Sequence, residues 1–220
     1  MKHDLFTDAL AGNVIGGKVN YAGLDARSSL RQYWREVALA ELDQEVTREQ
    51  ILAFYINAYN ALIIRGVLAG YKTTSFFQRI RFFYLLRHRI ANKTTNLYHL
   101  EHETIRPLGE PRIHFALVCS AKSCPKLLDS AYDAEAIDTQ LHENAVDFIN
   151  DKQKNAFNNQ SKTAYLSEIF KWFAKDFTHK TSLQQNLAQF VQDERTATYL
   201  RSDRFAIEYK KYDWNLNGLR

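Results

Sequence analysis

The segment 47–70 constrains the fold more than any other part of the chain. Thr47 and Gln50 have the spacing of a capping box, in which each side chain accepts a hydrogen bond from the other residue's backbone N–H. Gly70 stands just beyond the apolar run and is typical of a helix end. We therefore predict a long, largely apolar helix over 47–70.

Two asparagines interrupt the apolar surface of this helix. Asn57 and Asn60 are three residues apart, so they share one helix face. Burying an amide without a partner costs free energy, so each side chain must hold a backbone segment, a catalytic group or a ligand. Two hypotheses remain open for the pair: a hydrogen-bond clamp between the helix and a loop, and a polar site in which Asn57 binds an oxyanion and Asn60 a ligand.

The remaining pattern predicts more helix than strand. Apolar residues recur at helical spacing over 27–42, 131–150, 167–177 and 181–191, and strands are predicted over 113–119, 163–166 and 204–214. Because strands and helices are segregated, we expect an α+β fold, a helix-rich single domain packed on a small, mainly antiparallel sheet. A chain of 220 residues with 45% hydrophobic content fills one core, so residues 1–220 are predicted to form one domain.

Residues 113–125 read IHFALVCSAKSCP and carry both cysteines of the chain. A turn after Cys119 would leave its thiol at the mouth of the sheet, where a nucleophile is reachable. Thiol catalysis also needs a base and an orienting group, and His114 and Glu101 lie nearby in the sequence. The sequence therefore favours a cysteine-dependent hydrolase or acyl transferase, with Cys119 as nucleophile, His114 as base, Glu101 as orienting group and Asn57 as oxyanion donor.

Further polar residues are predicted to bind the substrate, an unidentified small molecule or peptide. His102 is an alternative base, and Arg106 can clamp a glutamate or a substrate carboxylate. Ser123 belongs to the predicted turn. Cys124 is an alternative thiol, because a helix beginning at Pro125 would lower its pKa.

Other interpretations of these residues compete with catalysis. Free cysteines and histidines in apolar strands are commonly core residues, and the two cysteines can also form one disulfide. The spacing of Cys119 and Cys124 reaches the outer limit for zinc ligands, but a second close pair is missing. We therefore expect no metal and no cofactor.

Charge is unevenly distributed along the chain. Residues 51–100 contain no aspartate or glutamate but seven lysines and arginines, interleaved with aromatic residues. The lobe 72–93 is therefore a candidate surface for an anionic partner, and it is the working surface if the protein is a non-catalytic binding module. The alternative is that its cations pair with acidic residues such as Asp133, Glu135 and Asp138 and that its aromatics are core. We expect no nucleic-acid binding, because base-stacking motifs are missing.

Five motifs resemble one known family. They are FYINAYNAL at 54–62, LEHETIRP at 100–107, IHFALVCSAKSCPKL at 113–127, LSEIFKWFAKDF at 166–177 and YDWNLN at 212–217. Their order and spacing resemble domain of unknown function 547 over about residues 19–217. The resemblance implies no activity. It implies bacterial or plant relatives, of which the bacterial ones often carry export signals.

The compartment stays open at this stage. The first residues contain no apolar signal core, so we expect a cytoplasmic protein, or a periplasmic or secreted one whose signal was removed. No stretch of eighteen uninterrupted apolar residues occurs, so the chain is predicted not to span a membrane.

Overall fold

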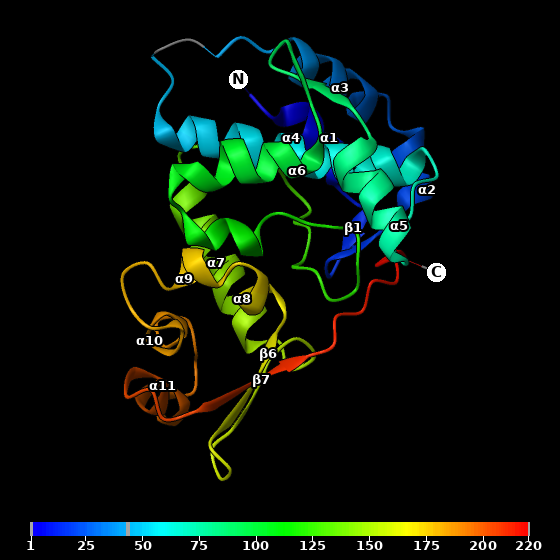
Figure 1. The fold of residues 1–220 in the computed structure, drawn as a ribbon. Helices are drawn as coiled ribbons and strands as arrows, with labels where there is room; N and C mark the ends of the chain where they lie inside the picture. Colours follow the sequence, from blue (N-terminus) through cyan, green and yellow to red (C-terminus); the bar gives the residue numbers. More distant parts are fainter. Residues whose placement is uncertain (1, 43–44, 220) are drawn as a thin grey trace.

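The helix predicted over 47–70 is the central element of the fold. The computed structural model describes residues 2–42 and 45–219 (Figure 1). In it, α4 (Arg48–Leu68) begins with the expected capping box between Thr47 and Gln50. Most side chains from Leu52 to Ile64 are buried. By length and composition α4 is able to cross a membrane, but 72% of its most apolar window is buried inside the fold, as in a core helix.

The N-terminal part of the chain packs around α4. Its elements are the helices α1 (Asp4–Leu10), α2 (Tyr21–Ala26) and α3 (Ser28–Leu39) and the antiparallel hairpin of β1 (Val14–Ile15) and β2 (Lys18–Val19). Phe6 of α1 stacks on Tyr33 of α3 with ring centroids 4.9 Å apart, and the indole of Trp34 donates to the carbonyl of Ala61. These contacts bury one face of α4.

The segment after α4 contains two π-helices. The helix α5 (Phe76–Arg79) continues as the π-helix Ile80–Leu85, and α6 (Leu97–His99) continues as the π-helix Leu100–Ile105. The antiparallel hairpin of β3 (His88–Ile90) and β4 (Lys93–Thr95) lies between them, and the short 3-10 helix Arg106–Leu108 follows. The Asn96 side chain caps α6 and donates to the carbonyl of Tyr84, which joins the two helical segments.

The C-terminal part forms a second hydrophobic core. Its helices are α7 (Ile137–Asn150), α8 (Ile169–Trp172), α9 (Ala174–Phe177), α10 (Leu183–Leu187) and α11 (Glu194–Arg201). They pack with a sheet of β5 (Ala156–Asn158), β6 (Thr163–Ser167) and β7 (Ala206–Lys210), in which β5 and β6 pair antiparallel and β6 and β7 pair parallel. Phe115, Phe148 and Phe170 lie in this core, separate from the one around α4. The expected α+β fold with a small, mainly antiparallel sheet is confirmed.

The predicted strand 113–119 is wrong. Residues Pro111–Phe115 form a 3-10 helix, and an irregular loop follows. The reason lies in Asn60, whose side chain binds the Ala116 carbonyl and the Val118 N–H, the groups that a sheet partner would need. The predicted strand 204–214 is also too long. It ends at Lys210, because Asp213 and Asn215 bind the backbone of the 120–123 loop instead.

The predicted helices 131–150 and 167–177 are shorter than expected. Tyr132 is held outside α7 by Asn57, which binds its backbone N–H and carbonyl. The first residue of 167–177, Ser167, belongs to β6, and Phe173 separates α8 from α9. Tertiary hydrogen bonds therefore set these boundaries rather than local pattern.

His88 is predicted to make stability fall on acidification. Its ring is 4% exposed, neither nitrogen has a hydrogen-bond partner among the described residues, and burial beside Arg65 lowers its pKa to about 4. Below pH 6.5 His88 is protonated in the unfolded chain, whereas in the folded chain it stays neutral down to about pH 4. The free energy of unfolding therefore falls as the pH is lowered from 6.5 to 4. Between pH 7 and pH 5 this costs about 2 kcal/mol.

Replacing His88 by leucine is expected to remove this cost, as measured by urea unfolding at pH 7 and pH 5. His142→Gln, at an exposed position of α7, is the control and should leave the pH dependence unchanged. Burial also lowers the pKa of His3 to about 4, so the contribution of His3 to the pH dependence of unfolding remains in both variants. An equal pH dependence in wild type and His88→Leu would contradict the assignment.

Candidate functional site

A cavity of about 650 Å³ lies between the two cores. Its wall is mainly aromatic, and the aromatic side chains that line it are Tyr59, Phe76, Phe83, Tyr84, Tyr98, Trp172, Phe173, Tyr212 and Trp214. Five of the predicted site residues also line it, namely Glu101, His102, His114, Cys119 and Cys124. The structure therefore brings together residues that are up to 23 positions apart in the sequence. Asn57, Asn60, Arg106 and Ser123 do not line the cavity.

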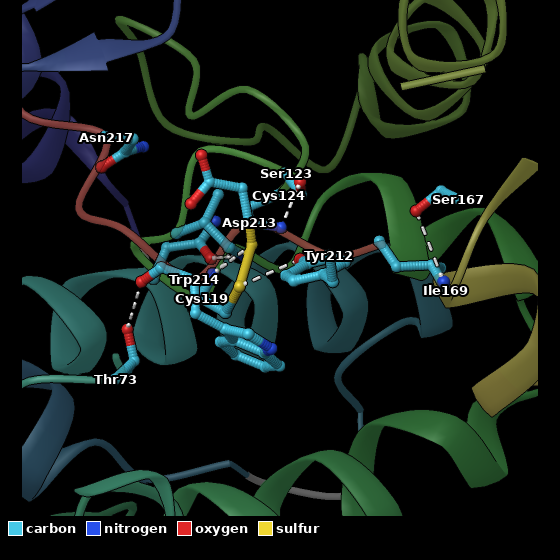
Figure 2. The surroundings of a disulfide bond; sticks show 12 residues. Thr73, Cys119, Ser123, Cys124, Ser167, Ile169, Tyr212, Asp213, Trp214 and Asn217 are labelled. Carbon is cyan, nitrogen blue, oxygen red and sulfur yellow. Dashed lines mark hydrogen bonds between the residues drawn. A yellow bond between two sulfur atoms is a disulfide. The ribbon is translucent and has the colours of Figure 1, made fainter. Parts of the chain in front are cut away.

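The two cysteines form a disulfide in the cavity wall (Figure 2). Cys124 is buried, and its Sγ accepts the backbone N–H of Cys119 at 2.7 Å. Cys119 is partly exposed, and its Sγ lies 3.2 Å from the hydroxyl of Tyr212. In this state Cys119 is no free thiol, so the predicted nucleophile requires reduction of the disulfide first.

Glu101 lies in the cavity wall on the π-helix Leu100–Ile105. Its carboxylate accepts a hydrogen bond from the hydroxyl of Tyr59 at 3.2 Å, so it does not orient His114 as predicted. Burial raises the pKa of Glu101 to about 7, against the opposing effects of Tyr59 and Arg106. Burial and the charge of Glu101 also raise the pKa of Tyr212 above its usual range, which keeps this hydroxyl protonated beside the sulfur.

Asp176, and not Glu101, makes the hydrogen bond to the ring of His114. Its Oδ2 lies 2.7 Å from Nε2 of His114, and Arg106 binds both carboxylate oxygens at 2.7 and 2.8 Å. Burial alone would raise the pKa of Asp176, but the hydrogen bonds from Arg106 and His114 hold it well below the usual range. The ionised carboxylate only accepts, so Nε2 of His114 carries the proton and Nδ1 is the basic nitrogen.

Both histidines of the cavity are kept neutral by their surroundings. Burial lowers the pKa of His114, whose ring stacks on Phe173 at 3.9 Å. Burial and the nearby Arg106 lower the pKa of His102, which stacks on Tyr98 and donates Nδ1–H to the Tyr98 carbonyl. Neutral imidazoles accept protons, so each remains available as a base.

Asn57 and Asn60 clamp α4 to two backbone segments, and the amide of Asn57, which was predicted to bind an oxyanion, is engaged in this way. Asn57 is fully buried. Its side-chain amide donates to the Tyr132 carbonyl and accepts from the Tyr132 N–H, at 2.8 Å each. Asn60 does the same with Ala116 and Val118, at 3.0 Å each. These bonds use both ends of each amide, which leaves neither side chain pointing at a ligand. The clamp hypothesis therefore describes both asparagines.

The YDWNLN motif supplies two side chains to the cavity wall, Tyr212 and Trp214, that were not among the predicted site residues. Ser123 is not in the cavity, because its hydroxyl accepts the backbone N–H of Asp213 (Figure 2). This bond fastens the C-terminal segment onto the disulfide loop, and Tyr212 and Trp214 then complete the cavity wall. The motif itself was the available signal, since it combines two aromatics with turn-forming Asp and Asn.

Both π-helices supply walls of the cavity. The first contributes Ile80, Phe83 and Tyr84, and the second contributes Glu101 and His102. Such helices are rare and occur often at functional sites. Across the described residues 2–42 and 45–219, no group of three or more His, Cys, Asp or Glu side chains is placed to hold a metal ion.

Fold and site together define a class, an α+β domain with an aromatic cavity, a buried carboxyl group and a disulfide in its wall. The family model described as protein of unknown function, DUF547, matches residues 44–149 of the chain. The match confirms the resemblance carried by the motifs at 54–62, 100–107 and 113–127. Searches of the curated proteins and of the solved structures found no match to this chain.

Asn60→Ala is predicted to lower the free energy of unfolding by about 3 kcal/mol, because a buried carbonyl and a buried N–H lose their partner. Asn57→Ala should cost a similar amount for the same reason. Urea unfolding measures both, and Gln32→Ala, on the exposed face of α3, is the control with an expected change within about 0.5 kcal/mol. A loss no larger than that of the control would contradict the clamp.

Proposed function

We propose that the cavity is a site of thiol–disulfide exchange between the Cys119–Cys124 pair and a bound dithiol. The observation that carries this proposal is the position of the disulfide in the wall of the cavity that Glu101, with its raised pKa, also lines. The partly exposed Cys119 is the sulfur that a substrate reaches, and the buried Cys124 is the leaving sulfur. A cavity of about 650 Å³ suits a small molecule or a peptide side chain with an apolar part.

The reaction proceeds through a mixed disulfide. A substrate thiolate attacks Sγ of Cys119, a substrate–Cys119 bond forms, and the Cys119–Cys124 bond breaks. Cys124 leaves as a thiolate that the backbone N–H of Cys119 stabilises. The second substrate thiol then attacks the substrate sulfur of the mixed disulfide and releases Cys119. The dithiol loses two electrons and becomes a disulfide, and its two protons end on the two cysteines.

Glu101 is the proton carrier in this scheme. A pKa of about 7 means that the carboxyl is half ionised near neutral pH, so it accepts a proton from an attacking thiol and returns it to a leaving thiolate. The hydroxyl of Tyr212 donates to Sγ of Cys119 and so stabilises negative charge there in the second step.

A second candidate is the thiol-dependent hydrolase or acyl transferase favoured by the sequence. The pairing of His114 with Asp176 supports it, because an oriented neutral imidazole shares the cavity with Cys119. In this candidate Cys119 acts only after reduction, His114 is the base and Asp176 replaces Glu101 as the orienting group.

Glu101→Gln is predicted to slow disulfide reduction by dithiothreitol. The ratio of the wild-type rate to the variant rate should rise with pH through about 7 and level off at roughly a hundredfold, because only the ionised carboxylate accepts the proton. Stopped-flow labelling of the released thiols gives the rates. Glu103→Gln, an exposed position on the same π-helix, is the control. A ratio that does not change with pH would exclude Glu101 as proton carrier.

Cys124→Ser separates the two candidate functions. Exchange predicts that Cys119 of the variant attacks a linear disulfide probe and stays joined to one half of it as a mixed disulfide, detectable by intact mass, while the other half leaves as a thiol; turnover of the dithiol stops. The hydrolase predicts that the variant cleaves a thiol-reactive ester at the rate of the reduced wild type and that His114→Gln abolishes this cleavage. A variant that does neither would leave the cavity as a binding site without chemistry.

A further inference from the structure

The outer face of α5 and the following π-helix carries exposed apolar side chains. Their exposed fractions are 62% for Phe76, 81% for Phe77, 45% for Tyr84 and 65% for Leu85. The rings of Phe76 and Phe77 contact each other with centroids 5.8 Å apart. Large apolar side chains gathered on one exposed helical segment mark an interaction surface more often than scattered ones do. We call residues 76–85 together with the cations around them the α5 face.

The cations of the α5 face form no salt bridge with an acidic residue among residues 2–42 and 45–219. Lys72, Arg81 and Arg87 are exposed, and Lys72 and Arg81 line one shallow cavity. None of the salt bridges within residues 2–42 and 45–219 involves a lysine or arginine of the segment 65–93. The pairing with Asp138 that the sequence left open is not seen, since Asp138 binds Arg112.

The segment is anchored firmly from its inner side. Phe82 is fully buried and packs against Gly66 of α4, where a Cβ would come within 2.7 Å of its ring. Arg79 lies over the ring of Trp214 at 4.5 Å, and the Thr73 hydroxyl donates to the Trp214 carbonyl. The exposed apolar side chains therefore stand on a segment that is fixed to α4 and to the C-terminal segment.

We propose that the α5 face docks on an anionic phospholipid bilayer. Phe77 and Leu85 enter the boundary between headgroups and acyl chains, and the unpaired cations meet the lipid phosphates and carboxylates. A second copy of the chain fits this face poorly, because two such faces would bring together cations of one sign with no carboxylate between them.

Docking in this orientation has a consequence for the cavity. Phe76 and Tyr84 belong both to the exposed face and to the cavity wall, and Ile80 and Phe83 line the cavity from the same segment. The cavity therefore opens next to the bilayer surface. The proposal does not depend on the disulfide chemistry, since it concerns the outer side chains alone.

Co-sedimentation with vesicles tests the docking. The wild-type chain should bind vesicles of phosphatidylcholine mixed with phosphatidylserine, should not bind phosphatidylcholine alone, and should release as salt rises. The double variant Phe77→Ser, Leu85→Ser should bind roughly tenfold more weakly, because the inserted side chains are lost. Arg81→Gln should also weaken binding to the charged vesicles, because a cation that meets the lipid headgroups is lost.

Matched variants outside the α5 face serve as controls. Leu39→Ser, at a side chain that is 58% exposed on α3, and Arg35→Gln, at an exposed position of the same helix, should bind as the wild type does. Absence of wild-type binding at low salt would overturn the proposal, and so would undiminished binding by the double serine variant. A dimer in sedimentation velocity that the double variant dissolves would also overturn it, in favour of a second copy.

Discussion

The hydrogen bonds that two asparagines of α4 make to the backbone hold the rest of the site in position. Asn60 fixes Ala116 and Val118, directly before Cys119, and Asn57 fixes Tyr132 at the far end of the same loop. The loop between them is irregular, so it lacks a sheet partner for its buried polar groups, and the amides supply one. The disulfide adds a covalent tie within this loop, which places its sulfurs at a fixed depth in the cavity wall.

The cavity exists because two hydrophobic cores meet without merging. Cys119 packs against both clusters, and Phe115 belongs to the C-terminal one although its neighbour Ile113 belongs to the cluster around α4. Side chains at such a junction are shared between two hydrophobic clusters, so the space between the clusters need not fill completely. The C-terminal segment closes the junction through Tyr212 and Trp214, which is why the last residues of the chain are part of the site.

Local signals explain what the sequence predicted correctly. The capping box of α4 and the need of Asn57 and Asn60 for partners follow from residues near one another, and both hold in the structure. The convergence of Glu101, His114 and Cys119 was also expected. The roles of Asp176 and Tyr212 were missed, because they lie 62 and 93 positions from the groups they contact. Pattern in one sequence carries no information about such pairs.

The two carboxyl groups near the cavity stand in opposite electrostatic settings. Asp176 has two cationic or proton-donating partners that bind it directly, and its pKa is held low. Glu101 accepts a hydrogen bond from the Tyr59 hydroxyl and feels the more distant charge of Arg106, but burial outweighs both and raises its pKa to about 7. Environments that separate the pKa values of two carboxyl groups in this way give them different roles: one carries a permanent charge and the other exchanges protons. Asp176 therefore fixes the tautomer of the neutral His114 ring. Near neutral pH it is Glu101 that changes protonation. Its charge acts on the hydroxyl of Tyr212, which stays protonated and contacts the disulfide.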